Sequence, residues 1–136
     1  MMTGQPLKST PDLRAGIAAF NQQDFHNAHE RFETAWRAAD ETERSAYRIL
    51  IHLSGGFFRL TQNRTRAAGK FFQHALQWSK KHGKTPDILD GIDLKTYLQG
   101  LINKIDHQVD AESLLKLHFK PLIIFHPEQA NDHSDE

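Results

Sequence analysis

The chain contains no cysteine, and this absence removes several classes of site at once. Disulfide frameworks, cysteine-ligated zinc ribbons and thiol nucleophiles all require that residue. A glycine-rich phosphate loop and a dinucleotide fingerprint are also missing, because Gly55 and Gly56 fall inside a helical pattern, where they favour close helix packing. No serine or threonine lies in a nucleophile motif. The sequence therefore does not indicate catalysis through a covalent nucleophile.

Long uncharged apolar runs are absent too, and the first residues lack the apolar core of a signal peptide. We therefore expect a cytoplasmic protein without a membrane partner. The 136 residues are 38% hydrophobic and 25% charged, which is the size and balance of one globular domain. The expected organisation is a flexible segment at 1–9, a single helical domain at 10–127 and a disordered acidic tail at 128–136.

Acidic residues are missing from residues 44–86, although the formal net charge of the chain is zero. This segment holds nine basic residues, namely Arg44, Arg48, Arg59, Arg64, Arg66, Lys70, Lys80, Lys81 and Lys84. The remainder of the chain has a matching excess of negative charge. Either the two parts attract each other within the fold, or the basic part presents a surface to an anionic partner.

Apolar residues recur with the period of a helix along nearly the whole chain, so the sequence predicts an all-α fold. We expect a compact bundle of about five helices with an extended C-terminal strap at 121–127. Thr10 before Pro11 starts the first helix, and Asp24 and Asp93 cap later ones. The acidic residues 40–43 are interpreted as a connection.

The third helix, over residues 44–62, is apolar on most sides, which is typical of a central, buried helix. Its one polar strip consists of Arg48, His52, Gly55 and Arg59. The fourth helix ends at Gly83, a natural left-handed C-terminal position. Short helical turns are expected at 84–87 and 114–117.

The second helix carries the sequence His29-Glu30-Arg31-Phe32-Glu33, which is similar to the HExxH helix of zinc peptidases. The second histidine of that motif is replaced by glutamate. Metal binding would need His29 and Glu33 as ligands, with His52 as the best third candidate, and would hold zinc or iron. No metal is expected by default; in the catalytic alternative the candidate residues are His29, Glu30 and Glu33, with Glu30 as base.

The favoured interpretation of the same residues is structural, because a buried arginine requires a carboxylate partner. The third helix supplies arginines and the second supplies glutamates on a flank of the core. The predicted polar network consists of His29, Glu30, Glu33, Arg48, His52 and Arg59. Such a network would set the register of the two helices and could also form the floor of a site for a small anion.

Two stretches, GIAAFNQQDFHNAHERFETAWR and LIHLSGGFFRLTQNRTRAAGKFFQHAL, resemble the domain of unknown function 309 family of small bacterial, archaeal and plastid proteins. The signature positions are Phe20, Asn21, His29, Glu30, Glu33 and Trp36. Asn63 and the apolar tail after Pro121 are also similar, so the resemblance covers roughly residues 13–125. It implies a compact all-α bundle and supplies no activity. The small residues that follow Asn63 are placed differently from the family's Gly-Ala pair.

These observations favour a non-enzymatic helical module that binds a protein or a small ligand, and self-association to a homo-oligomer is possible through an exposed apolar patch. The first alternative is the metal-dependent hydrolase or metal-binding protein described above. The second is nucleic-acid binding through the fourth helix. Its basic surface would comprise Arg64, Arg66, Lys70, Lys80, Lys81 and Lys84.

Overall fold

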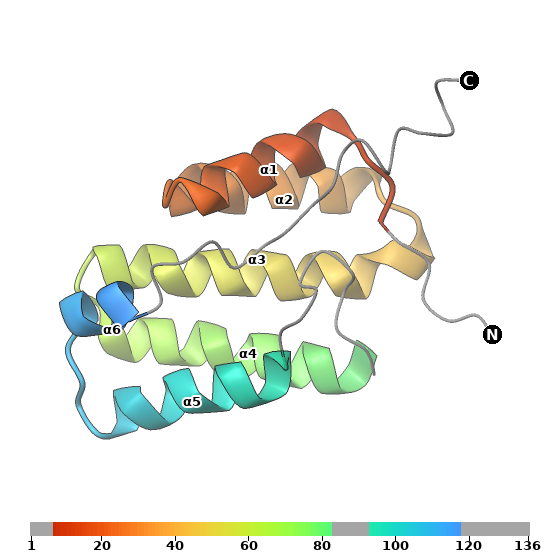
Figure 1. The fold of residues 1–136 in the computed structure, drawn as a ribbon. Coiled ribbons are helices and arrows are strands. Elements are labelled where there is room, and N and C mark those ends of the chain that lie inside the picture. Colours follow the sequence, from red (N-terminus) through yellow and green to blue (C-terminus); the bar gives the residue numbers. More distant parts are fainter. Residues whose placement is uncertain (1–6, 83–92, 118–136) are drawn as a thin grey trace.

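The computed structural model describes residues 7–82 and 93–117, and every regular element in these two ranges is a helix (Figure 1). The predicted all-α bundle is confirmed. The six helices are α1 (Pro11–Asn21), α2 (Phe25–Ala38), α3 (Glu41–Thr61), α4 (Thr65–His82), α5 (Leu94–Asp106) and α6 (Ala111–Leu117). None of the described helices has the length and apolar character needed to span a bilayer.

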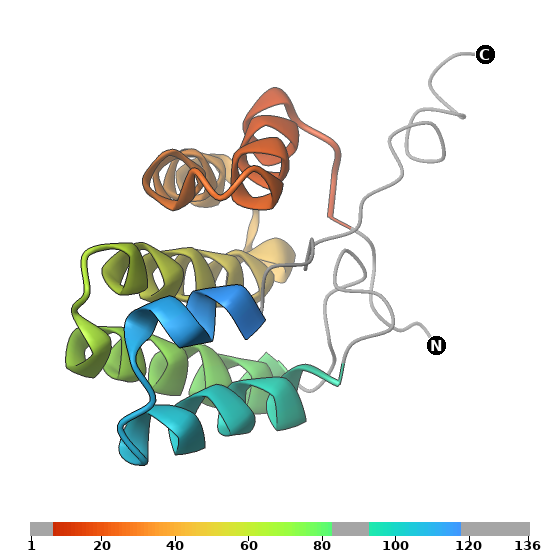
Figure 2. The same ribbon diagram turned by 60° about the vertical axis from the view of Figure 1, so that its left-hand side comes forward.

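Helix α3 occupies the centre of the bundle, as its apolar pattern predicts. Helix α2 packs against it on one side and α4 on the other, while α1 covers α2 and α5 covers α4 (Figure 1). Figure 2 shows the short α6 lying against α3 above α5. The core joins all six helices, and its largest fully buried side chains include Phe32, Tyr47, Leu50 and Phe72. Burial, with the charge of Glu43, raises the pKa of Tyr47 to about 12.

Glycines at two points of α3 let the neighbouring helix approach closely. A Cβ atom at Gly56 would lie 2.4 Å from the ring of Phe72, and one at Gly55 would lie 2.5 Å from the ring of Phe71. Both distances are far below ordinary contact, so a larger residue would force the Phe71 or Phe72 ring, and the packing of α4 around it, to shift. The predicted packing role of the Gly55-Gly56 pair is confirmed.

The helix starts follow the capping signals with one exception. Thr10 accepts a hydrogen bond from the Leu13 amide at 3.1 Å, and Asp93 accepts one from the Thr96 amide at 3.3 Å. Asp24 stands at the predicted position before α2, but its side chain makes no capping hydrogen bond.

The prediction that residues 40–43 form a connection is wrong, because α3 begins at Glu41. Acidic residues are favourable in the first turn of a helix, where they face the positive end of its dipole. Asp40 precedes the helix in an extended conformation and accepts a hydrogen bond from the Thr42 hydroxyl at 2.8 Å. The acidic cluster is therefore a helix start.

Three helix ends share one turn geometry, with a left-handed residue at Gln23 (φ 66°), Asn63 (φ 60°) and Gln108 (φ 65°). In each turn the amide of that residue donates to the carbonyl three residues back. The next amide donates to the carbonyl five residues back, and all these bonds measure 2.8–3.0 Å. This is the Schellman arrangement, formed here without glycine. The turns after α1, α3 and α5 are thus closed by backbone hydrogen bonds.

Some sequence predictions fall outside the described residues: the helical turn at 84–87, the strap at 121–127, the acidic tail and Lys84. Lys8 lies in the segment 1–9 that was expected to be flexible, and it contacts the start of α3 in the structure. Leu7 is buried, and the Lys8 backbone amide donates to the Glu43 carboxylate at 3.1 Å. The side chain of Lys8 also lies 3.2 Å from Asp40.

Candidate functional site

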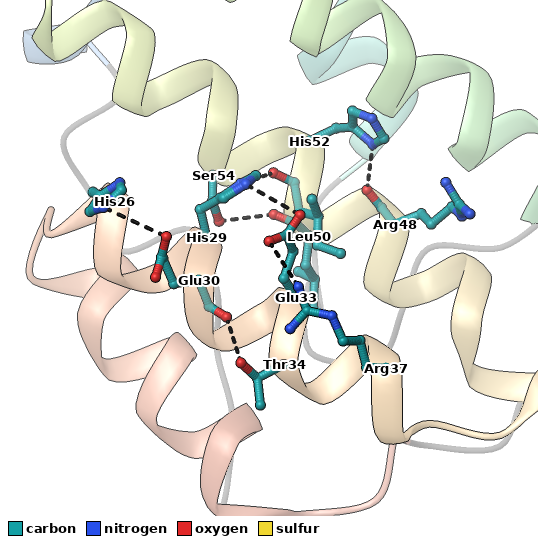
Figure 3. A network of polar contacts seen from close by, with 11 residues as sticks. His26, His29, Glu30, Glu33, Thr34, Arg37, Arg48, Leu50, His52 and Ser54 are labelled. Atoms are coloured by element: carbon teal, nitrogen blue, oxygen red, sulfur yellow. Dashed lines mark hydrogen bonds and ion pairs between the residues drawn. The ribbon is translucent and has the colours of Figure 1, made fainter.

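The candidate residues of α2 form a short chain of contacts along that helix. His29 Nε2 lies 3.8 Å from Glu33 Oε2, and Glu33 Oε1 lies 3.8 Å from Arg37 Nη2 (Figure 3). His29 Nδ1 lies 3.2 Å from the carbonyl oxygen of Ile51 in α3. Because a carbonyl can only accept, Nδ1 carries the proton of this hydrogen bond. His29 therefore ties α2 to α3 by a bond to the backbone.

Glu30 lies apart from that contact, on the exposed side of α2. Its carboxylate is 3.7 Å from His26 Nε2, and both side chains are more than half exposed. The ring of His26 packs against Phe58 of α3, with ring centroids 4.9 Å apart. The carboxylate of Glu30 is therefore paired with His26, which is not part of the predicted network.

The third predicted metal ligand, His52, points away from His29 and toward α4 (Figure 3). Its Nδ1 donates to the Arg48 carbonyl at 2.8 Å, and its ring lies 5.2 Å from that of His74. Burial lowers the pKa of His52 below its ordinary value, and the hydrogen bond to the Arg48 carbonyl opposes this shift. The charges of His74, Arg48 and His29 add smaller contributions in the lowering direction. Among residues 7–82 and 93–117, no three His, Cys, Asp or Glu side chains gather closely enough to hold a metal ion. His29 and Glu33 alone supply two ligands, fewer than a protein zinc site uses.

Arg48 makes contacts that the sequence interpretation did not anticipate. Its guanidinium lies 4.9 Å from the ring centroid of Trp36 in α2 and 4.9 Å from that of Trp78 in α4. It therefore bridges the two helices that flank α3. The expected ion pair with Glu33 is not formed, since that carboxylate is held by His29 and Arg37.

Other cations of α3 and α4 stack in the same way. Arg44 lies 4.8 Å from the Trp36 ring, Lys81 lies 5.1 Å from the Trp78 ring, and Arg59 lies 4.7 Å from the Phe71 ring. In the described ranges, no carboxylate comes within ion-pair distance of these cations. We call this set the stacked face, and it comprises Trp36, Arg44, Arg48, Arg59, Phe71, Trp78 and Lys81.

The physical reason is the chemistry of the guanidinium group. It is flat, delocalised and weakly hydrated, so an aromatic face satisfies it without a counter-charge. The partners were visible in the sequence as the only two tryptophans of the chain. Their helical positions gave no indication that both would reach the same arginine, because that depends on how α2 and α4 rotate about α3.

The predicted basic surface is divided between two places on α4. Arg66 and Lys70 line a depression beside α5 and α6, while Lys81 belongs to the stacked face at the other end of the helix. Arg64 and Lys80 are exposed and form no ion pair with another described residue.

Chemically, the stacked face offers guanidinium N–H groups at the edges of rings that already hold them in place. Arg48 and Arg59 donate no side-chain hydrogen bond to any described residue. A stacked guanidinium can bind a carboxylate through its edge without leaving the ring. The face is therefore suited to groups with negative charge.

Comparison with known proteins gives a family match over part of the chain. No curated protein and no solved structure gives a match to this chain. A family model described as Domain of unknown function (DUF309) matches residues 13–71, which run from α1 into the first half of α4. The matched segment contains His29, Glu33, Trp36 and Arg48. The resemblance to the DUF309 family is therefore confirmed, over residues 13–71.

Proposed function

We propose that this protein is a non-catalytic interaction module that binds an acidic segment of a partner protein through the stacked face. One observation carries the proposal: Arg48 is held between Trp36 and Trp78 with no carboxylate beside it among the described residues. A cation in that state is already positioned and has its hydrogen-bonding edge available. The partner would supply the missing counter-charge.

The composition of the face supports a protein partner. Tryptophan and arginine are the residues most enriched among those that dominate binding energy at protein interfaces. Their side chains are also held by their neighbours before binding, which reduces the entropy cost of association. The net charge of the face is positive, so an acidic partner would approach faster than a neutral one.

In this proposal His29 and Glu33 do not contact the partner; they help to position Trp36. His29 joins α2 to the backbone of α3 at Ile51, and Glu33 joins His29 to Arg37. The contact of His29 with Ile51 holds α2, and therefore Trp36, at a set position against α3. The contacts of Glu33 lie within α2 and steady the His29 side chain. The cluster that resembles a metallopeptidase motif would thus act by positioning a binding residue.

The two tryptophans provide a direct test, because both contact Arg48 and no other tryptophan contributes to the emission. We would titrate the protein with poly-L-glutamate and record tryptophan fluorescence. The expected result is a saturable change in emission that weakens as salt is added. Arg48→Gln should raise the apparent Kd by about tenfold, the effect of losing one charge-assisted contact.

A matched control is Arg64→Gln, which removes the same charge from an exposed position away from the stacked face. It should change the apparent Kd by less than about twofold. Equal losses in the two variants would mean that the polymer responds only to net charge, and the proposal would be abandoned. Binding of a thymidine oligonucleotide, but not of poly-L-glutamate, would instead support the nucleic-acid alternative.

A further inference from the structure

The α3–α4 turn and the α5–α6 turn lie at the same end of the bundle (Figure 1). A depression of about 830 Å³ is lined by residues of these two turns and of the adjoining helices. We call it the end pocket. The first part of α4 forms one wall, and the end of α5 with the start of α6 forms the other. Its polar lining includes Asn63, Arg66, Lys70, Gln73, Asp106 and Gln108. The volume falls in the usual range of small-molecule sites.

Charges of opposite sign line this pocket without pairing. Arg66 and Lys70 stand one turn apart on α4, and Asp106 belongs to the opposite wall. All three side chains are exposed, and none forms an ion pair or hydrogen bond with a described residue. The pocket therefore separates two cations from a carboxylate across open space.

The helices themselves gain no stability from these charges. Asp106 is the last residue of α5, where the negative end of the helix dipole disfavours a carboxylate. Arg66 is the second residue of α4, where the positive end disfavours a cation. Asp110 of the same pocket differs, because it accepts a hydrogen bond from the Ser113 amide at 3.3 Å and so caps α6. That contact with Ser113 lowers the pKa of Asp110.

We propose that the end pocket binds a small phosphate ester that carries several hydroxyl groups, such as a sugar phosphate. Arg66 and Lys70 would hold the phosphate, because two cations on one helix turn match its charge. Asp106 would accept hydrogen bonds from hydroxyl groups, and the side-chain amides of Asn63 and Gln108 can both donate and accept. This inference is independent of the function proposed for the stacked face.

The carboxylates of the pocket decide against a polyanion as its ligand. Asp106 and Asp110 would face the further phosphates of a nucleic-acid strand and repel them. A small ester avoids this cost, because its single phosphate lies on the cationic wall and its hydroxyl groups lie on the acidic wall. The same features exclude an apolar ligand, whose burial would leave these polar groups without partners.

The test is calorimetric titration of the full chain with ribose 5-phosphate, glucose 6-phosphate, glycerol 3-phosphate and inorganic phosphate. We expect at least one ester to bind more tightly than inorganic phosphate. The double variant Arg66→Gln/Lys70→Gln should raise the Kd of that ester by at least about tenfold. Asp106→Asn should raise the Kd of the ester by about tenfold and leave that of inorganic phosphate unchanged or lower. Amide chemical shifts of Gly69 and Val109, which line the pocket, should move during the titration.

A matched control is Lys80→Gln/Lys95→Gln, which removes two exposed charges elsewhere on α4 and α5. Its Kd for the ester should stay within about twofold of the wild-type value. Three results would each overturn the proposal. The first is that no ester binds at about 10 mM. The second is an equal loss of ester affinity in the control and pocket variants, and the third is an ester Kd that Asp106→Asn leaves unchanged.

Discussion

The stacked face and the end pocket differ in what surrounds their positively charged side chains. On the face, Arg44, Arg48 and Arg59 each lie over an aromatic ring. In the pocket, Arg66 and Lys70 have neither a ring nor a carboxylate in contact within the described part of the chain. The cations of the face therefore contribute to folding through stacking and buried stems, whereas those of the pocket do not.

This difference separates two kinds of site. A cation that stabilises the fold can also bind a partner, so its replacement changes stability and binding together. A cation that contributes nothing to the fold changes binding alone when it is replaced. The comparison predicts that variants of the face lose stability and that variants of the pocket keep it.

The largest contrast in stability is expected between Gly55, which lies beneath Phe71 of the stacked face, and Gly69, which lines the end pocket. Gly55→Ala should lower the free energy of unfolding by about 2 kcal/mol, because its Cβ would lie 2.5 Å from the Phe71 ring and 3.4 Å from His29. Gly69→Ala in the pocket meets only Ile105, at 3.4 Å. It should raise that free energy by up to about 1 kcal/mol through helix propensity. Urea unfolding monitored by circular dichroism measures both, and the reverse order of the two values would contradict the comparison.

The second-largest difference in stability is expected between an arginine of the stacked face and an arginine of the end pocket. Arg48→Ala removes contacts with two tryptophan rings, so we expect a loss of about 1–2 kcal/mol in the free energy of unfolding. Arg66→Ala should change it by less than about 0.5 kcal/mol, as for an exposed residue without partners. Chemical unfolding of the two variants side by side provides the measurement. Equal losses would show that stacking does not distinguish the regions.

A smaller change, a gain in stability, is expected from a substitution in the turn that borders the end pocket. Gln108→Gly relieves a left-handed conformation at φ 65° and should raise the free energy of unfolding by about 0.5–1 kcal/mol. Gln23→Gly provides the control, because it makes the same change in the equivalent turn after α1. Similar thermal stabilisation in both would attribute the effect to the turn. A loss confined to Gln108→Gly would mean that this side chain stabilises the pocket wall.

The smallest effect should be a response to acid at His52, whose ring packs beside Phe71 of the stacked face. Burial lowers the pKa of His52 in the folded state, so between that value and the ordinary value of 6.5 the unfolded chain binds more protons. Stability contributed by neutral His52 is therefore complete above pH 6.5 and is lost as pH falls through the folded-state pKa. His82 has a pKa lowered by burial and acts in the same direction.

Unfolding curves between pH 5 and 8 measure this response. The variant His52→Gln should show a shallower loss of stability on acidification than the wild type. The polar lining of the end pocket contains no histidine, so ribose 5-phosphate binding should not share the pH dependence assigned to His52. An unchanged slope in His52→Gln would assign the acid response to other groups.

Much of the fold was predictable because its signals are local. Thr10, Pro11 and Asp93 start helices at the predicted places, and the apolar pattern of α3 identified the central helix. The error at residues 40–43 arose because acidic residues serve both in loops and in the first turn of a helix. Where the helix begins therefore depends on how the residues around Glu41 pack in the fold, and the local sequence does not give that.

The candidate site was predictable only in part. The contact of His29 with Glu33 follows from their spacing of one helical turn. The contacts of Arg48 with Trp36 and Trp78 did not follow, because a guanidinium can be satisfied by aromatic rings as well as by a carboxylate. The end pocket was missed completely, since Arg66 and Asp106 lie 40 positions apart and neither belongs to a motif.

By itself, the amino-acid sequence determined the helices, their buried faces and the excess of positive charge in residues 44–86. These properties depend on the order of residues within a few turns. Only the tertiary structure decided that Arg48 would lie between two tryptophans and that Asp106 would face Arg66 across a pocket. Both arrangements depend on the rotation and spacing of whole helices, which the packing of all six sets together.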